Sequence, residues 1–139
     1  RLDKFFGSWL SEFSPDYTPA ETGMDRFVAF NKGADFIGRS AVEAERQSGA
    51  ARKLVIFEVD ADDADAVGYE PVWINGQVKG FCTSGGYSHT VQKSIALALV
   101  DGASLSDDLE AKIEILGDMR PAKRIHQMLF DADGSRMRG

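Results

Sequence analysis

The residues with the greatest chemical potential gather in one stretch, CTSGGYSHT, which begins at Cys82. It holds the only cysteine of the chain, one of the two histidines, two serines and a Gly-Gly pair. A cysteine nucleophile needs a histidine base within hydrogen-bonding reach and a third group that orients the base. If residues 80–84 form a strand and Gly85-Gly86 begins a turn, Cys82 and His89 lie on opposite limbs of one connection. A Cys/His dyad is then possible but not enforced.

A structural turn is the alternative interpretation of the same stretch. A phosphate-binding loop would need a lysine after the glycines and a helix to follow, and a serine elbow would need G-x-S-x-G; neither pattern is present. Gly85 and Gly86 suit backbone angles that other residues resist, and the nearby hydroxyls suit turn amides. Tyr87 and His89 are large and polar at an expected rim, so they remain candidates for ligand contact.

Carboxylates and aromatics near the beginning of the chain are the next candidates. Asp3, Glu12 and Asp16 have the chemistry of general acids or bases, but no partner is visible, so a solvated face or a helix cap is the alternative. Trp9 and Tyr17 flank the first prolines, where they would either stack on a planar ligand or cover the core. The residues alone leave these alternatives open.

The acidic segment DADDADAVG, residues 60–68, superficially resembles a calcium loop because its carboxylates alternate with other residues. The helix-loop-helix frame is missing, and no glutamate closes the loop at the twelfth position. We therefore predict a solvated turn here and no metal site.

Length and charge limit the class of protein. The chain has 139 residues, enough for one ordinary domain with a buried core, and a net charge of -6, so no basic surface is expected to hold nucleic acid. One cysteine cannot form an internal disulfide, and two histidines do not complete a closed zinc site with it. No apolar run is long enough to span a bilayer. We expect a soluble protein of a reducing, cytoplasmic compartment, with neither nucleic acid nor membrane as a partner.

Periodicity divides the chain into a helical beginning and a β-rich remainder. Apolar residues at helical spacing predict a short helix over residues 1–10, and MDRFVAFN indicates a strand over residues 24–31. The segment between this helix and this strand contains two prolines, so we expect it to be extended and rich in turns. Ser40 and Glu43 form a predicted capping box for a helix that ends before Gly49.

From residue 52 onward, short β-branched and aromatic runs alternate with tight turns. Asn75-Gly76 between apolar flanks predicts a type I′ hairpin. Further strands are expected at residues 53–60, 94–100, 109–116 and 124–129. The pattern predicts an α+β, mostly β chain, in which a short helical lead-in precedes a small antiparallel barrel or sandwich over roughly residues 52–130.

Several segments in this order carry a family resemblance. RLDKFFGSWL, DYTPAETG, DFIGRSAV and GYEPVWINGQVKGFCTSGGYSHTVQKSIALALV together resemble folate-dependent aminomethyltransferases, the T-protein of the glycine cleavage system and its relatives. DYTP, TSGGYSHT and the ending LFDADGSRMRG look most like the C-terminal folate half of FAD-dependent dimethylglycine and sarcosine dehydrogenases. The resemblance covers essentially the whole chain. It implies that the barrel is of the Greek-key type found in the aminomethyltransferase C-terminal domain.

The resemblance also implies a place in a larger enzyme. In this family a three-part ring holds tetrahydrofolate in a central channel and gives it a one-carbon unit. Residues 1–50 would be the tail end of the folate-binding domain with one capped helix, and residues 51–139 the C-terminal barrel domain. The chain would then be a C-terminal fragment that helps to form the folate channel. The alternative is a structural or assembly module of its parent enzyme, with no direct ligand contact.

The residues expected to contact folate follow from the same resemblance. They are Trp9, Tyr17, Glu21, Tyr87 and Arg136. Glu21 has an equal alternative role, which is to bind backbone amides in the P-x-E-x-G turn.

No catalytic residue is expected in this chain. The family's usual carboxylates, and the arginine before R-L-E, would precede Arg1, so the fragment alone should be inactive. FAD would bind only in an upstream part of the parent. Two positions depart from the family pattern, since Asp3 replaces the family's glutamate and Leu10 replaces a common glycine.

The remainder of the parent polypeptide is the main expected partner, besides folate. An apolar face left without that partner predicts self-association. Its expected residues are Phe5, Phe6 and Trp9.

Overall fold

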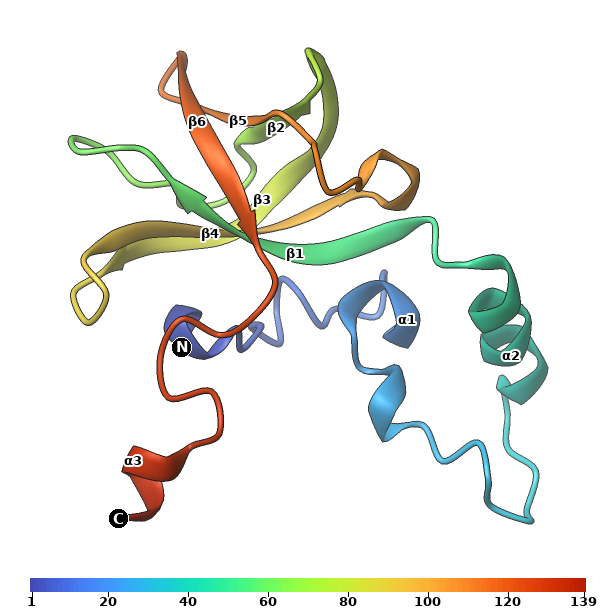
Figure 1. The fold of residues 1–139 in the computed structure, drawn as a ribbon. Helices are drawn as coiled ribbons and strands as arrows, with labels where there is room; N and C mark the ends of the chain where they lie inside the picture. The colour runs from blue at the N-terminus through green and yellow to red at the C-terminus, as the bar shows by residue number, and fades with distance from the viewer.

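Six antiparallel strands close into a barrel in the computed structural model, which describes residues 1–139 (Figure 1). Their order around the barrel is β1-β4-β3-β2-β5-β6, and β6 returns to pair with β1. The strands β2, β3 and β4 form a meander, and β1 lies beside β4 after a long connection, which makes a Greek key. The strands are β1 (Arg52–Val59), β2 (Pro71–Ile74), β3 (Gln77–Ser88), β4 (Lys93–Asp101), β5 (Ala111–Ile115) and β6 (Asp118–Ile125). The prediction of a mostly β chain with an antiparallel barrel is confirmed.

The turn between β2 and β3 lies at the predicted place. Asn75 and Gly76 have φ angles of 49° and 77°, and two positive φ angles in succession define the type I′ turn. The predicted hairpin is therefore confirmed.

Strand β4 is buried on both sides, which explains its unbroken apolar sequence. All of residues 94–100 are buried. Alternate side chains such as Ala98 join the main core inside the barrel, whereas Ile95 and Leu97 belong to a second cluster. Leu2 packs against that second cluster from outside the barrel. With both faces covered, the usual alternation of apolar and polar residues disappears.

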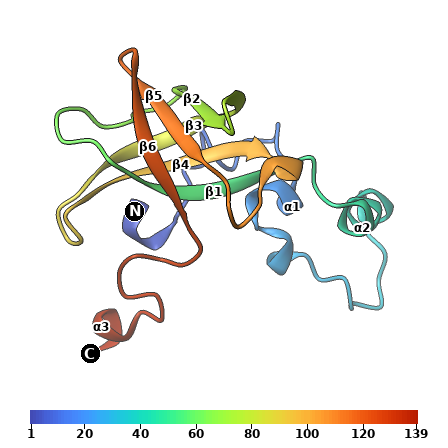
Figure 2. The same cartoon turned by 45° about the horizontal axis from the view of Figure 1, so that its top comes forward.

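The lead-in, which we define as residues 1–50, runs along one side of the barrel before the chain enters β1 (Figures 1 and 2). Its regular elements are η1 (Leu2–Lys4), α1 (Pro19–Thr22), η2 (Asp25–Phe27) and α2 (Arg39–Ser48). After the barrel, a tail leads from β6 to α3 (Ser135–Arg138), while η3 (Gly102–Ser104) follows β4.

Two predicted elements of the lead-in are wrong. The helix predicted over residues 1–10 is only the single 3-10 turn η1, because Phe5 takes a left-handed φ of 54° and packs against the second cluster. The strand predicted over residues 24–31 is absent, because no strand pairs with it. Its backbone groups bond locally instead, as in the bonds from Phe27 N to Met24 O and from Val28 N to Asp25 O, each 3.0 Å long.

Helix α2 is present but begins differently from the prediction. It ends before Gly49, as expected, but its N-cap is Gly38, with a φ of 86° and no side-chain cap bond. The predicted Ser40 capping box is therefore wrong. Glu43 instead pairs with Arg39, with Nε and Oε1 2.8 Å apart.

The glycine pair of CTSGGYSHT does not begin a turn, because both residues lie inside β3. A Cβ on Gly85 would lie 2.3 Å from the carbonyl oxygen of Ala66, so glycine is needed where the acidic loop crosses the strand. The turn between β3 and β4 comes later, at residues 89–92.

The last strand is shifted relative to its prediction. β6 runs from Asp118 to Ile125, so the strand predicted over residues 124–129 is wrong beyond its first two residues. Every β6 residue is at least partly exposed and the strand contains Pro121, so its sequence shows neither an apolar alternation nor a proline-free run.

Candidate functional site

Glu21 lies at the centre of the junction between the lead-in and the barrel. It is the third residue of α1, and it forms a capping box with Thr18, the residue just before the helix; Pro19 occupies the first turn. Thr18 Oγ1 accepts a hydrogen bond from Glu21 N at 3.2 Å, and Glu21 Oε2 accepts one from Thr18 N at 3.0 Å. Gly23 ends the helix with a left-handed φ of 71°. The capping box therefore fixes the position of the Glu21 carboxylate.

The carboxylate of Glu21 is also bound by Arg52, the first residue of the barrel. Arg52 donates from Nε to Oε1 at 2.8 Å and from Nη2 to Oε2 at 3.4 Å, while Glu21 is only 4% exposed. Burial alone would raise the pKa of Glu21, but the bonds from Arg52 and Thr18 outweigh it and lower the pKa below its usual value. Arg52 also lies over the ring of Tyr17, with Cζ 5.0 Å from the ring centroid.

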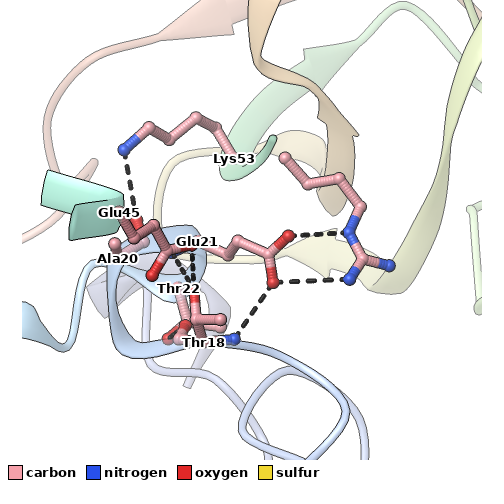
Figure 3. Close-up of polar contacts among 7 residues, drawn as sticks. Thr18, Ala20, Glu21, Thr22, Glu45 and Lys53 are labelled. Atoms are coloured by element: carbon pink, nitrogen blue, oxygen red, sulfur yellow. Dashed lines mark hydrogen bonds and ion pairs between the residues drawn. The ribbon is translucent and has the colours of Figure 1, made fainter. Parts of the chain in front are cut away.

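Neighbouring side chains extend the same junction. Thr18 Oγ1 donates to Glu45 Oε1 of α2 at 2.7 Å, and Lys53 Nζ donates to Ala20 O at 3.1 Å (Figure 3). These bonds connect α1 both to α2 and to β1. This arrangement suits a rigid support for Tyr17. The charge of Glu21 is neutralised within the chain by Arg52.

Two further carboxylates of the lead-in bind serines of β3. Glu12 is fully buried and accepts hydrogen bonds from Ser84 Oγ, Ser8 N and Ser11 Oγ, the last at 2.8 Å. Burial would raise the pKa of Glu12, but these donors outweigh it, so the pKa lies below the ordinary value of 4.5. Asp3 accepts a hydrogen bond from Ser88 Oγ in the same way. Both carboxylates therefore anchor the lead-in to the barrel.

The surroundings of CTSGGYSHT show whether its cysteine, histidine and serines could act in nucleophilic catalysis. Cys82 has no exposed surface and belongs to the apolar core, and its burial raises the pKa of the thiol to about 12. His89 is exposed in the β3–β4 turn, so the two residues do not form a nucleophilic dyad. The serines of the stretch, Ser84 and Ser88, are anchoring groups for carboxylates.

Tyr87 and His89 lie beside an open groove of about 960 Å³, which we call the acidic groove. Their rings meet edge to face, with centroids 5.1 Å apart. The acidic loop, residues 60–68, forms the other wall. Within it, Asp63 pairs with Arg120 at 2.9 Å and Asp65 accepts from Ser94 at 2.7 Å. The carboxylates of these two residues are therefore already engaged.

A smaller hollow of about 120 Å³ lies where Tyr17 meets the barrel. Tyr69 lines it and stacks on Phe81, with ring centroids 6.2 Å apart and planes inclined by 11°. Tyr69 is 87% exposed. Its φ is 72°, which is a costly backbone angle for an aromatic residue. The loop holds it there, since the Glu70 carboxylate accepts from the amides of Val67 and Gly68 at 2.8 Å each. We call this the Tyr17 hollow. Its lining residues are Leu10, Ser11, Ser14, Asp16, Tyr17, Tyr69, Phe81 and Thr83.

The five residues predicted to contact folate lie in different surroundings. Tyr17 and Glu21 come together through Arg52, as described above. Trp9 is 80% exposed, Tyr87 lines the acidic groove, and Arg136 lies over Phe130 in the tail, 5.2 Å from its ring centroid. Contact of any of the five with folate stays a prediction.

Sequence reasoning missed Arg52 and Tyr69. Arg52 gives no signal of its own, because its partner stands in a different segment, 31 residues earlier. The Thr18–Glu21 capping box was visible as T-x-x-E, but the prolines around it indicated an extended segment instead. Tyr69 carries no sequence signal for its left-handed angle, which only the loop contacts impose.

The exposed apolar face differs from its prediction at one position. Phe6 and Trp9 are exposed, but Phe5 packs against the second cluster of the barrel.

None of the helices is long and apolar enough to cross a membrane.

Comparison with known proteins places the fold in a family. Residues 52–131 match the family model of the glycine cleavage T-protein C-terminal barrel domain, so the chain belongs to that family. The crystal structure of the glycine cleavage system aminomethyltransferase T from Bartonella henselae has a similar fold, with a TM-score of 0.78 and 24% sequence identity over 95% of this chain and 37% of that one.

Curated relatives extend the similarity into the lead-in. The mitochondrial dimethylglycine dehydrogenase of Mus musculus is 40% identical over 99% of this chain and 16% of its own length. The aminomethyltransferase of Geobacillus sp. (strain WCH70) is 40% identical over 82% of this chain and 31% of its own length. The chain thus spans a third or less of these relatives, and the resemblance to both groups is confirmed.

Proposed function

We propose that this chain forms part of the wall of a tetrahydrofolate channel in a larger one-carbon enzyme of the aminomethyltransferase or dimethylglycine dehydrogenase type. Family membership and the match across both lead-in and barrel support this proposal. Tetrahydrofolate would accept the one-carbon unit, and the residues of this chain would bind and orient it. Any FAD would bind in another part of such an enzyme.

The Tyr17 hollow is the observation that carries the proposal. Tyr17 and Tyr69 present aromatic surface on which a pterin ring can stack, and the Asp16 carboxylate beside them can accept hydrogen bonds from pterin nitrogens. The guanidinium group of Arg52 lies over the ring of Tyr17, and its charge is neutralised by Glu21. These residues therefore fit one end of a reduced folate. Trp9, one residue before Leu10 of the lining, offers a further exposed ring.

The remaining predicted contacts have separate places in this proposal. Tyr87 and Arg136 do not line the Tyr17 hollow, so they would meet folate only through other parts of the channel. The three anchoring carboxylates Asp3, Glu12 and Glu21 already have partners within the chain, so none of these three is free for a proton-transfer role. Asp16, which lines the Tyr17 hollow, is assigned to the pterin instead. We propose that the chain is inactive alone. A cytoplasmic location remains a prediction.

Calorimetric titration of tetrahydrofolate into the chain tests this proposal. We expect saturable binding that weakens about tenfold in Tyr17→Ala, because stacking of a ring is worth about 1 kcal/mol or more. Trp9→Ala should weaken it by a smaller factor. Phe27→Ala is the matched control, because Phe27 is exposed but lies outside the hollow. Equal affinity in Tyr17→Ala and wild type would contradict the assignment of the hollow.

A structural or assembly module is the second candidate function. The mitochondrial pyruvate dehydrogenase phosphatase regulatory subunit of Mus musculus, named for regulation, is 35% identical over 75% of this chain and 12% of its own length. In this case Trp9→Ala and Tyr17→Ala would reduce the stability or assembly of the parent protein and leave its folate affinity unchanged. The same two variants therefore separate the candidates.

A further inference from the structure

The turn between β2 and β3 holds two reactive groups that the proposed function does not use. Asn75 and Gly76 are both exposed, and their positive φ angles place them at the two central positions of the turn. The side-chain amide of Asn75 is an electrophile, and the backbone nitrogen of Gly76 is the nucleophile next to it in the chain. Attack of this nitrogen on the side chain would close a succinimide ring.

The nucleophile is free in the folded chain. The amide of Gly76 donates to no other group of the protein, because the ladder of β2 and β3 ends at Ile74 and Gln77 on either side of it. A Cβ on Gly76 would meet no atom within 4 Å, so the space beside its Cα is open. Glycine has no side chain that would hinder the approach of its nitrogen to the side-chain carbon of Asn75. The site therefore has an accessible nucleophile beside its electrophile.

Asn31 is the only other asparagine of the chain and shows the contrast. It is also exposed, but the residue after it is Lys32. The backbone amide of Lys32 donates to Ala29 O at 3.3 Å, and its side chain reaches the ring of Phe36, with Nζ 4.6 Å from the centroid. The nucleophile beside Asn31 is therefore both bonded and hindered. Exposure does not separate the two asparagines, whereas the amide that follows each of them does.

Two hydrogen bonds to Glu110 restrain the reaction in the folded chain. Asn75 Oδ1 accepts from Glu110 N at 3.1 Å, and Asn75 N donates to Glu110 O at 2.9 Å. Ring closure draws the side-chain carbon of Asn75 toward Gly76 N, so it competes with the first of these bonds. The contact with Glu110 should therefore slow the modification without preventing it.

We propose that Asn75 is a site of spontaneous deamidation, in which Gly76 N displaces ammonia from the Asn75 side chain. The backbone nitrogen gives its proton to hydroxide and bonds to Cγ, while the bond from Cγ to Nδ2 breaks and ammonia leaves with a proton from water. Water then opens the succinimide at the side-chain carbonyl, which gives aspartate, or at the backbone carbonyl, which gives isoaspartate. This modification does not depend on the function of the Tyr17 hollow.

The isoaspartate product would alter the shortest strand of the barrel, β2. It adds a backbone atom to the turn that joins Ile74 to its partner Gln77. Ile74 also pairs with Ala111 of β5 and fills the main core, where it is 1% exposed. A longer turn disturbs both pairings, so the modification would loosen β2 slowly and irreversibly. Aspartate, in contrast, keeps the oxygen that accepts from Glu110 N.

Incubation of the 139-residue chain at neutral and mildly alkaline pH, followed by peptide mapping with mass spectrometry, tests the proposal. We expect Asn75 to convert at least about tenfold faster than Asn31, because only Gly76 offers an unhindered nitrogen. The rate should rise in proportion to the hydroxide concentration. Gly76→Ala should slow the conversion by a similar factor. Gly117→Ala is the matched control, because Gly117 has a φ of 89° in the β5–β6 turn and also meets no atom there.

A second pair of variants tests the role of the contact with Glu110. Glu110→Pro removes the amide that binds Asn75 Oδ1, whereas Glu110→Ala keeps it. Glu110→Pro should accelerate the conversion about fivefold, which is the factor that a neutral hydrogen bond contributes, and Glu110→Ala should leave the rate unchanged. Unfolding of wild type in urea removes the same contact and should also accelerate the conversion, so the test holds even if Glu110→Pro does not fold.

The products complete the test. The isoaspartate form, isolated by chromatography, should melt at a lower temperature than Asn75→Asp. The proposal is overturned if Asn75 and Asn31 convert at the same rate in the folded chain, or if Gly117→Ala slows the conversion as much as Gly76→Ala. Equal rates in folded and urea-unfolded wild type would overturn the restraint assigned to Glu110.

Discussion

Replacing the buried carboxylate of Glu12 by an amide should destabilise the fold by a predictable amount. Glutamine keeps the shape but removes the charge that strengthens three hydrogen bonds, from Ser8 N, Ser11 Oγ and Ser84 Oγ. A hydrogen bond to a charged group contributes about 1 kcal/mol more than a neutral one, so Glu12→Gln should lower the free energy of unfolding by about 3 kcal/mol. Asp62→Asn, in the exposed acidic loop, should change it by less than about 0.5 kcal/mol.

The same variant should change the acid dependence of stability. The pKa of Glu12 is lower in the folded chain than its ordinary 4.5, so the unfolded chain binds more protons as the pH falls. The stability that Glu12 contributes is therefore complete above pH 4.5 and is lost as the pH falls through its lower folded pKa. Glu12→Gln should lack this part of the acid-induced loss.

Urea unfolding, followed by circular dichroism at neutral pH and at about pH 4, provides the assay. A double-mutant cycle of Glu12→Gln with Ser84→Ala should give a coupling energy of about 1 kcal/mol, because the two residues share one of the three bonds. A coupling energy near zero, or an unchanged acid-induced loss in Glu12→Gln, would refute the reasoning.

Three further perturbations have defined outcomes. Gly85→Ala should lower the free energy of unfolding by about 3 kcal/mol, because its Cβ would lie 2.3 Å from Ala66 O, whereas Gly33→Ala, which meets no atom, should have little effect on the melting temperature. Cys82 should resist an alkylating reagent in the folded chain and react only after unfolding, because it is buried and its pKa is raised to about 12; rapid labelling of the folded chain would contradict this. Thr18→Ala should cost about 1 kcal/mol in urea unfolding by removing the cap of α1, and an unchanged midpoint would show that the capping box carries no weight.

The barrel could be predicted from sequence because its signals are local. Strand β4 is an unbroken apolar run and Asn75-Gly76 encodes its own turn, so pattern and structure agree there. The sequence does not predict the bounds of β6, because the strand contains Pro121 and none of its positions is buried, whereas strand prediction relies on the opposite features.

The lead-in was harder to predict because distant contacts decide its structure. The sequence of residues 24–31 has strand propensity, but a strand needs a partner and none is present. Phe5 fits a helical pattern in the sequence, but in the structure it packs against the second cluster of the barrel. Of the site, Tyr17 and Glu21 could be named from sequence, whereas their connection through Arg52 depends on the closed barrel.

The anchoring of the lead-in by side chains has a consequence for the order of events in folding. Its bonds to the barrel join residues 72, 85 and 31 positions apart, through Glu12, Asp3 and Glu21. We expect these bonds to form only after β1 and β3 are in place, because the loops that they close are long. The lead-in should therefore behave as a separate cooperative unit, whose amides exchange with solvent through a partial opening that leaves the barrel amides protected.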